Sequence, residues 1–582
     1  MKIKKIIISN KKMVKLLTIL VYVISICIYE LGICNGKEIK NYIENGCLIY
    51  NFSFPRLVLY IIFLIFLTKF IKKNIDDVLK SLNTKTKKII LGIYIPTSII
   101  IITYVLLKWT SIYKVMTIAI TLLMGFIFII YISSNYIKNI IVTTFTLGIV
   151  FTFATDFHHS IDEKKHMMSA INLANGNFNY TENPLNEPVY NNIIFNCDID
   201  SFVQFFSQRY ESGLTGEWNR TEETEIYYLS SSPADYNFIL YIPSATGILF
   251  AKLLGGSVAD IYIIGRIFNL ITYALLLIII MKLLPYKKKI FYIIFMLPFT
   301  VLIAASYSID GICIGLLGIF IAYCLNLCER KYETIKLKQI ITLIVLFLLC
   351  MLAKNLAYFS ILIFIFVLPI FKILKNNKKS LPILISIILI ISVIGMIFLI
   401  NKLNVANSEG GDPRGGTTSV KGQIEFLVNS PINILKVGLT HMGNSILNYN
   451  WYTDLNHSGF FGEYSSQIFL LEFFFIIYVI ITDNEKIVNK RINLVSIVTF
   501  LAVFITTSFM LYLTFTPVGE INLLGYQPRY ITPILPIILM LLNDKRFISK
   551  SSDEKQKNID LNICLILGFF TFIDLLCLTH IV

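Results

Sequence analysis

Long apolar runs, each about the length needed to cross a bilayer, recur along this chain and constrain its fold more than any other feature. They begin at Leu16 and continue to the carboxyl terminus. A helix needs roughly 20 apolar residues to cross the hydrocarbon core, whereas a membrane barrel would show alternating strands. Hydrophobic residues make up 56% of the 582 residues, and the mean hydropathy is +0.71. The sequence therefore predicts an all-α polytopic membrane protein.

Short clusters of lysine and arginine separate the apolar runs and indicate how the spans are oriented, because basic residues are enriched in cytoplasmic loops. Placing the clusters inside predicts about 13 to 15 transmembrane helices. The first five spans are expected near residues 14–34, 56–71, 89–107, 115–131 and 139–155. The same clusters account for the net charge of +15, so we expect a lipid bilayer and no nucleic acid as partner.

The region 238–284 allows two topologies. It holds either two short spans, 238–254 and 261–283, or one span together with a re-entrant or interfacial helix. Two spans would place Lys287 and the lysines after it outside and would invert every later segment. We therefore expect one net crossing in this region.

Residues 156–237 are too polar for the membrane and too long for a simple connector. They hold thirteen acidic residues against four basic ones, a net of −9 and the opposite bias from the inside loops. We expect a large outward-facing first loop domain here, with a short amphipathic helix over 162–175 lying along the membrane. A second outward loop is expected over 402–466.

Asp162, Glu163 and His166 follow the fifth span and form the first candidate site. On a helix, residues three or four apart share one face, so both carboxylates can approach the imidazole. Such a group can act as a general base or hold a divalent cation. The alternative is a solvated acidic turn that begins a helix.

Asp310 and Lys354 interrupt apolar segments on the same predicted side, and ionisable groups at membrane depth are candidate functional residues. The alternatives are a solvated loop aspartate and a lysine that extends to the headgroups. Arg529 and Tyr530 lie at the outer membrane surface, where a guanidinium suits a lipid-linked phosphate. Their alternative is an interfacial aromatic belt with one arginine.

Cys34, Cys47 and Cys197 fall in predicted outward loops, where disulfide pairing is open to them. Most of the ten cysteines lie in apolar runs, and the chain has no CxxC spacing.

Several motifs in a fixed order resemble the domain-of-unknown-function 2142 family of bacterial membrane proteins. They are Asp162-Glu163-x-x-His166, Tyr241-x-Pro243 with Gly247, Gly265-Arg266 with Asn269, Leu297-Pro298 leading to Ser306-x-Ser308-x-Asp310, Lys354 with Tyr358, Gln423 to Pro431, Thr516-Pro517-Val518-Gly519, and Gln527-x-Arg529-Tyr530-x-x-Pro533. The resemblance covers roughly residues 140–545. Two positions depart from it, since Ile161 replaces a proline and Pro528 replaces a glycine.

This family looks like the C superfamily (GT-C) of integral-membrane glycosyltransferases. The resemblance implies a GT-C-like catalytic domain over residues 139–545, preceded by additional helices over 1–138 and followed by a cytoplasmic linker and last helix over 546–582. It also implies a bacterial plasma-membrane enzyme with an outward active site, a polyprenyl-phosphate sugar donor, a glycan or wall-polymer acceptor and an inverting reaction.

By the same resemblance, Asp162 is the catalytic base or metal ligand, with Glu163, His166 and Asp310 completing the catalytic group. A divalent cation, Mg²⁺ or Mn²⁺, is an optional cofactor on Asp162, Glu163 and His166. The residues expected to bind the donor phosphate are Arg529, Tyr530, Lys354 and Arg266.

A transporter or flippase for lipid-linked glycans is the alternative from another class. Transporters keep their ionisable groups near the bilayer midplane, whereas those of this chain gather at one predicted surface. The sequence therefore favours the enzyme.

Overall fold

The structure is a computed structural model that describes a large part of the chain. The described residues are 2–34, 53–82, 84–108, 112–155, 162–176, 236–256, 258–329, 337–353, 357–368, 418–448, 466–483, 485, 489–542 and 553–578. Every regular element in these ranges is helical. The predicted all-α class is therefore confirmed.

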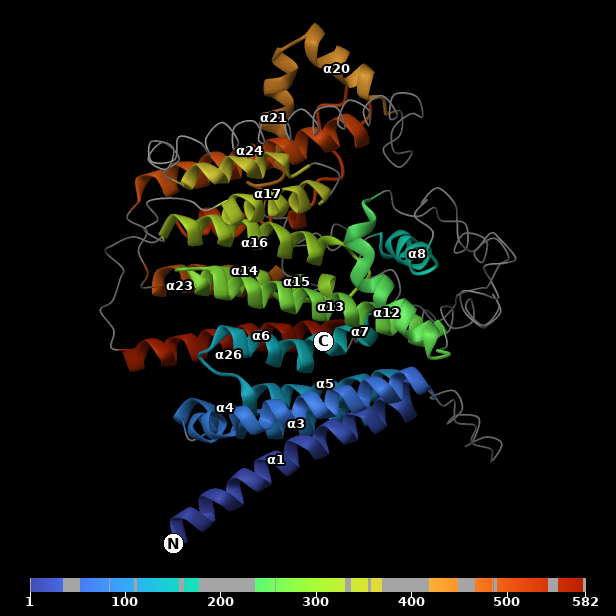
Figure 1. Ribbon diagram of the computed structural model, residues 1–582, viewed down its shortest axis with the longest axis vertical. Helices are drawn as coiled ribbons and strands as arrows, with labels where there is room; N and C mark the ends of the chain where they lie inside the picture. Colours follow the sequence, from blue (N-terminus) through green and yellow to red (C-terminus); the bar gives the residue numbers. More distant parts are fainter. Residues whose placement is uncertain are drawn as a thin grey trace. The chain divides into compact units, whose positions relative to one another are not determined.

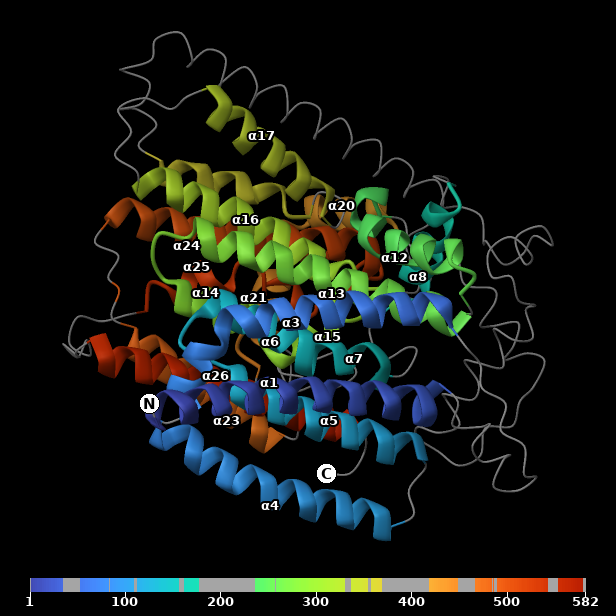
Figure 2. The same cartoon turned by 60° about the horizontal axis from the view of Figure 1, so that its bottom comes forward.

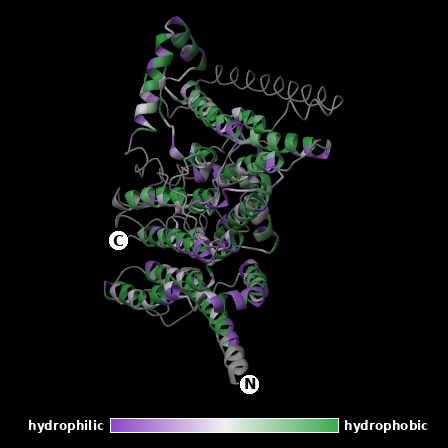
Figure 3. Cartoon of the chain, turned by 90° about the vertical axis from the view of Figure 1, so that its left-hand side faces the viewer, coloured by the Kyte–Doolittle hydropathy of each residue, from purple (hydrophilic) through white to green (hydrophobic). Residues whose placement is uncertain are grey.

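Nine helices in the described ranges are long and apolar enough to cross a membrane, and hydrophobic residues run along most of their length (Figure 3). They are Lys11–Leu31, Phe54–Leu82, Lys85–Leu107, Lys114–Tyr131, Tyr136–Ala154, Asp260–Leu283, Asp310–Glu329, Lys490–Phe515 and Glu554–Leu578. The chain is thus a polytopic membrane protein. The total of 13 to 15 spans stays a prediction, because parts of several apolar runs lie outside the described residues.

The chain divides into two compact units. The first comprises residues 1–274, 296–309 and 551–582, and the second comprises 275–295 and 310–550. These units do not follow the predicted boundaries at residues 138 and 545. The predicted domains stay predictions.

The first unit contains the amino-terminal helices, the acidic cluster and the last helix (Figure 1). Its elements are α1 (Lys2–Ile28), η1 (Tyr29–Cys34), α3 (Phe54–Leu82), α4 (Lys85–Leu107), α5 (Ile112–Tyr131), α6 (Tyr136–Thr143), η2 (Thr144–Gly148), α7 (Ile149–Ala154), α8 (Glu163–Ala174), η3 (Phe238–Tyr241), α12 (Ile242–Leu253), the first part of α13 (Val258–Leu283), α15 (Pro298–Ala304) and α26 (Asp553–Leu578).

Helix α5 forms the centre of the amino-terminal bundle and packs against α1, α3, α4 and α26 (Figure 2). Of the most apolar stretch of each helix, 67% is buried in α5 but only 6% in α4. Helix α4 therefore leaves most of its apolar residues partly or fully exposed, as expected of a helix that faces the membrane. Thr84 caps its first turn by accepting from the Lys87 amide, as is usual for threonine at this position.

Polar contacts in the first unit join ends that the lysine distribution places on the same side. Lys11 pairs with Asp76, and the Lys87 ammonium donates to the Ile130 carbonyl at 2.8 Å, at ends predicted inside. Arg56 and Asp260 pair at ends predicted outside. These contacts agree with the predicted orientation of the first spans.

The second unit contains the remaining elements. They are the last part of α13, α14 (Lys288–Phe295), α16 (Asp310–Glu329), α17 (Leu337–Leu352), η4 (Phe359–Val367), α20 (Val420–Asn429), α21 (Ile432–Asn444), α23 (Ser466–Thr482), α24 (Lys490–Phe515), η7 (Pro528–Tyr530) and α25 (Leu535–Leu539). Helix α24 packs against η4, α20 and α25, and α16 packs against α17 and η4. The Lys287 ammonium lies 2.8 Å from Asp483, which joins two linkers predicted inside.

The region 238–284 forms a short helix, α12, followed by the long α13. Together with η3, which precedes it directly, α12 forms the helical segment Phe238–Leu253, which rises about 26 Å and is short for a hydrocarbon core of about 30 Å. Only the 26-residue α13 is long enough to cross. The structure therefore agrees with one net crossing here.

Candidate functional site

The acidic cluster begins helix α8, which runs from Glu163 to Ala174 and confirms the helix predicted over 162–175. Asp162 is its N-cap residue and has a left-handed backbone with φ of 58°. In the described residues, Asp162 and Lys287 are the two positions other than glycine with positive φ. Such a conformation costs roughly 1 to 2 kcal/mol for most side chains, but aspartate and asparagine adopt it more readily than others.

Asp162 is the most exposed of the three predicted residues. Its side chain makes no capping hydrogen bond, and its carbonyl accepts from the His166 amide at 3.1 Å. Asp162 is half-buried, whereas Glu163 and His166 are buried. Of the three predicted residues, Asp162 is therefore the one best placed to meet a substrate.

Glu163 is held by Arg266 of α13 in a two-point ion pair. Arg266 Nε lies 2.8 Å from Glu163 Oε1, and one terminal nitrogen lies 2.7 Å from Oε2. Both side chains have no exposed surface. A buried guanidinium and carboxylate neutralise each other well only with such aligned hydrogen bonds. The pair fixes Glu163 and removes it from the candidates for a freely acting base.

The guanidinium of Arg266 also contacts backbone carbonyls and an aromatic ring. Its other terminal nitrogen donates to the Thr152 carbonyl at 3.0 Å and to the Thr155 carbonyl at 3.1 Å. Its guanidinium carbon lies 4.1 Å from the centre of the Tyr262 ring. This burial argues against the predicted contact of Arg266 with a donor phosphate, since the guanidinium faces protein groups throughout. Its role in this structure is to position Glu163.

A second donor reaches Glu163 from the polar patch that follows α15. The Tyr307 amide donates to Glu163 Oε1 at 3.0 Å, and Asn269 donates to the Ser306 carbonyl at 2.8 Å. The cluster of α8 thus lies against the beginning of the Ala304–Gly311 patch, as the predicted outward side of both segments requires.

His166 faces aromatic residues. Its Nδ1 lies 2.9 Å from the Tyr241 hydroxyl, and its ring centre lies 5.7 Å from that of Tyr236. In the part of the chain that the structure describes, no three His, Cys, Asp or Glu side chains form a metal-binding group. Both carboxylate oxygens of Glu163 bond to Arg266. Asp162, Glu163 and His166 therefore do not fit the Mg²⁺ or Mn²⁺ ion that the resemblance allowed.

The second unit brings together Asp310 and Arg529, for which the sequence predicted separate roles. Arg529 Nε lies 3.2 Å from Asp310 Oδ2, and the two side chains are each 6% exposed. Tyr530 follows Arg529 and lies under its guanidinium at 5.6 Å. The Tyr358 hydroxyl donates to the Tyr530 carbonyl at 3.0 Å. Asp310 and Arg529 thus lie on one side, as predicted, and neutralise each other.

Some predicted positions lie outside the described residues. They are Lys354, most of the outward loops 156–237 and 402–466, and the side chains of Cys34, Cys47 and Cys197. The phosphate contact of Lys354 and the disulfide pairing stay predictions.

Gln423 connects two sequence motifs that are distant in the chain, Gln423 to Pro431 and Thr516 to Gly519. Its amide nitrogen donates to the Thr516 and Pro517 carbonyls at 3.2 and 2.9 Å, and its oxygen accepts from the Gly519 amide at 3.1 Å. Gly519 has φ of +83°, a conformation for which glycine is suited. The side chain of Gln423 in α20 therefore holds the turn at Thr516 to Gly519, which lies close in sequence to Arg529.

His441 is a buried residue that the sequence did not single out. Its Nε2 lies 2.8 Å from the Ser508 hydroxyl, and its ring stacks on Phe504 with 5.2 Å between centres. Tyr526 meets the same ring edge-on at 4.7 Å. Burial lowers the pKa of His441 to about 4. A lone histidine between apolar residues gave no sequence signal for this cluster.

Residues 145–538 match the family described as predicted membrane proteins, domain of unknown function 2142 (DUF2142). The match covers the acidic cluster, the Asp310–Arg529 pair and the Gln423 turn. No curated protein and no solved structure matches the chain. Because the match spans more than half of its length, the chain belongs to the DUF2142 family of predicted membrane proteins.

Proposed function

We propose that this protein is a membrane glycosyltransferase. It moves a sugar from a polyprenyl-phosphate donor to a hydroxyl of a glycan or wall polymer on the outer face of a bacterial plasma membrane. The observation that supports this most is the arrangement around Asp162, where one half-buried carboxylate stands beside a buried and neutralised Glu163–Arg266 pair.

In this proposal Asp162 is the general base. It takes the proton of the acceptor hydroxyl while the acceptor oxygen forms a bond to the anomeric carbon. The bond from that carbon to the donor phosphate oxygen breaks, and the polyprenyl phosphate leaves with the bonding electrons. Attack from the face opposite to the phosphate inverts the anomeric configuration. General base catalysis of this kind contributes roughly 10²- to 10⁴-fold.

Glu163 and Arg266 act as positioning residues. Their ion pair and the Tyr307 amide fix the first turn of α8, and the left-handed backbone at Asp162 then directs its carboxylate. Holding a reacting group in the correct orientation lowers the activation free energy of the reaction substantially. Because Asp162, Glu163 and His166 do not fit a metal ion, the proposed reaction includes no step through a metal.

Arg529 and Tyr530 are the residues that we propose to bind the donor phosphate. A guanidinium binds phosphate oxygens in the same two-point manner as a carboxylate. Asp310 is the internal anion on Arg529, so the incoming phosphate replaces or shares this partner. In this proposal Asp310 neutralises the Arg529 guanidinium when no donor is bound.

The test uses membranes that contain the full-length protein, its Asp162→Asn variant or its Asp76→Asn variant. Asp76 supplies a matched control, because its side chain is 66% exposed and its pairing with Lys11 lies at the opposite predicted side. Mass spectrometry follows the conversion of polyprenyl-phosphate sugar to polyprenyl phosphate after addition of cell-wall acceptor.

We expect conversion by the native protein and by Asp76→Asn, and a loss of at least about 100-fold in Asp162→Asn. Full conversion by Asp162→Asn would contradict the role of the base. Movement of the intact donor across the bilayer without release of its sugar would identify a flippase instead.

A further inference from the structure

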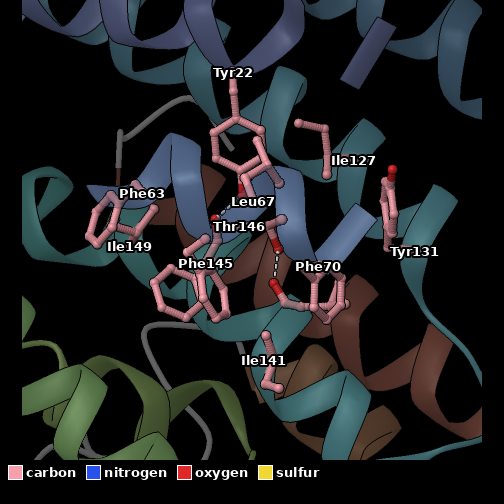
Figure 4. Close-up of a pocket in the computed structure, with 12 residues that line it drawn as sticks. Tyr22, Phe63, Leu67, Phe70, Ile127, Tyr131, Ile141, Phe145, Thr146 and Ile149 are labelled. Carbon is pink, nitrogen blue, oxygen red and sulfur yellow. Dashed lines mark hydrogen bonds between the residues drawn. The ribbon is translucent and has the colours of Figure 1, made fainter. Parts of the chain in front are cut away.

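Two adjoining cavities lie inside the first unit, among α1, α3, α5, α7 and α13. Their volumes are about 480 and about 800 Å³, including the space at their open sides. Tyr22, Phe63 and Ile149 line both of them. Figure 4 shows the smaller one, with the rings of Tyr22, Phe70 and Phe145 around it. The shared residues show that the two cavities are neighbours, and we call the two together the joined cavity.

This joined cavity is long and follows helix α3. The α3 residues that line it recur at spacings of three or four and therefore share one helix face. They are Arg56, Tyr60, Phe63, Leu64, Phe66, Leu67 and Phe70. Arg56 and Phe70 are fourteen residues apart, which corresponds to about 21 Å along the helix axis. The cavity thus extends through most of a hydrocarbon core of about 30 Å.

Its walls are largely apolar, and several of the hydroxyl groups that line it bond to the protein. Tyr22 donates to the Phe145 carbonyl, Thr146 donates to the Val142 carbonyl at 2.6 Å, and Ser25 donates to the Val21 carbonyl at 2.8 Å. A polar ligand would lose its hydration here without replacement. A hydrocarbon chain loses nothing, and it gains dispersion contacts with closely packed rings, which is what drives association inside a bilayer.

The cavity ends at a charged group on the predicted outer side. Arg56 Nε lies 2.8 Å from Glu30, and another of its nitrogens lies 2.6 Å from Asp260. Tyr60 donates to Glu30 as well. Two carboxylates on one guanidinium leave no net positive charge for a phosphate. The occupant therefore places a chain in this cavity, and its headgroup lies elsewhere.

The same cavity adjoins the proposed catalytic cluster at Thr152 and along α13. Thr152 lines the larger cavity, and its carbonyl accepts a hydrogen bond from Arg266 at 3.0 Å. Ile263, Ile264 and Ile267 of α13 also line it and flank Arg266 in sequence. A chain in the cavity is thus one side chain away from the residue that positions Glu163.

From these observations we infer that the joined cavity binds the hydrocarbon chain of a membrane lipid. Resting on the proposed function, that lipid is the polyprenyl-phosphate donor, whose chain would be held between the amino-terminal helices and α13. Most of this lining precedes residue 145, where the family match begins. The amino-terminal helices then contribute lipid binding that the matched region alone does not supply.

The first experiment uses the native full-length protein in nanodiscs. Undecaprenyl phosphate with a diazirine near the end of its chain is photolysed, and labelled residues are found by peptide mass spectrometry. Phosphatidylglycerol with a diazirine in an acyl chain serves as the second arm. Helix α4 is the reference for membrane-facing labelling, because Ile99 and Ile100 are 60% and 66% exposed.

We expect undecaprenyl phosphate to label peptides with Tyr22, Phe63 or Ile149 at least about 5-fold more than phosphatidylglycerol does. Equal labelling of these residues by both lipids would overturn the assignment to the donor and leave a general hydrocarbon-chain site. Labelling confined to α4 and other membrane-facing positions would overturn the site itself.

A variant then tests the joined cavity directly. Ile149→Trp fills the point shared by both cavities, and Ile99→Trp is the matched substitution on the exposed face of α4. Cavity labelling should fall at least about 5-fold in Ile149→Trp and persist in Ile99→Trp; unchanged labelling in both variants would overturn the proposal. Ile127→Phe, a smaller filling of the smaller cavity, serves if Ile149→Trp does not fold. A labelled cavity in a protein that transfers no sugar would contradict the proposed function and leave the lipid site standing.

Discussion

Glu163 and Arg266 are 103 residues apart in the chain and meet as a fully buried ion pair with contacts of 2.8 and 2.7 Å. The Tyr307 amide adds a third donor to the same carboxylate. One carboxylate therefore joins α8, α13 and the segment after α15. The position of Asp162 depends on this junction, since Asp162 is its immediate neighbour.

Replacing Glu163 with glutamine should destabilise the protein strongly. The substitution leaves the Arg266 charge buried without its counter-ion, which costs about 3 to 5 kcal/mol. Chemical unfolding in detergent micelles measures the change. Glu425→Gln is the control, because Glu425 and Lys421 are 61% and 75% exposed and such pairs contribute about 1 kcal/mol or less. Equal losses in the two variants would contradict the structural role of the buried pair.

Asp162 should respond differently to asparagine and to alanine. Asparagine accepts the left-handed backbone, so Asp162→Asn should unfold at nearly the native denaturant concentration. Alanine does not, and Asp162→Ala should lose about 1 kcal/mol more through strain at φ of 58°. Identical unfolding midpoints for the two variants would show that the first turn of α8 relaxes without cost.

Gly247 should not tolerate a side chain. A Cβ at this position would lie 2.7 Å from the Ile264 carbonyl and 2.9 Å from the Gly265 Cα, so α12 and α13 would have to move apart. Gly247→Ala should cost about 1 to 3 kcal/mol. Gly92→Ala in α4 meets no atom within 4 Å and should stabilise its helix by up to about 1 kcal/mol. Thermal melting of both variants by tryptophan fluorescence tests the pair, and a stable Gly247→Ala would contradict the close approach.

Protonation of His441 should destabilise the protein in acid. Its pKa is about 4 in the folded protein and about 6.5 in the unfolded chain. Between these values the unfolded state binds more protons, so stability is complete above pH 6.5 and falls as the pH drops toward 4. The loss due to His441 is on the order of 3 kcal/mol. The free energy of unfolding of the native protein and of His441→Gln is measured between pH 4 and pH 7. The variant should lose this part of the pH dependence, and an equal change of unfolding free energy with pH in both proteins would contradict the prediction.

The apolar runs predicted much of the fold because span length and hydrophobicity are local properties. Helix α8 was predicted for a similar reason, and basic loops placed Asp310 and Arg529 on one side before any contact was known. The role of Arg266 was not predictable. Within an apolar run an arginine is equally suited to a ligand or to an internal carboxylate, and only tertiary packing shows that Glu163 is its partner. His441 and Gln423 depend in the same way on neighbours distant in sequence.

The ion pair of Arg56 with Asp260 has a consequence for how the protein can be divided. Arg56 belongs to the helices that precede the family match, whereas Asp260 lies within it. Asp260 is 1% exposed in the full chain, and a chain shortened to begin at residue 139 would lose the guanidinium that pairs with this carboxylate. The amino-terminal helices thus supply a counter-ion to the part that the family shares.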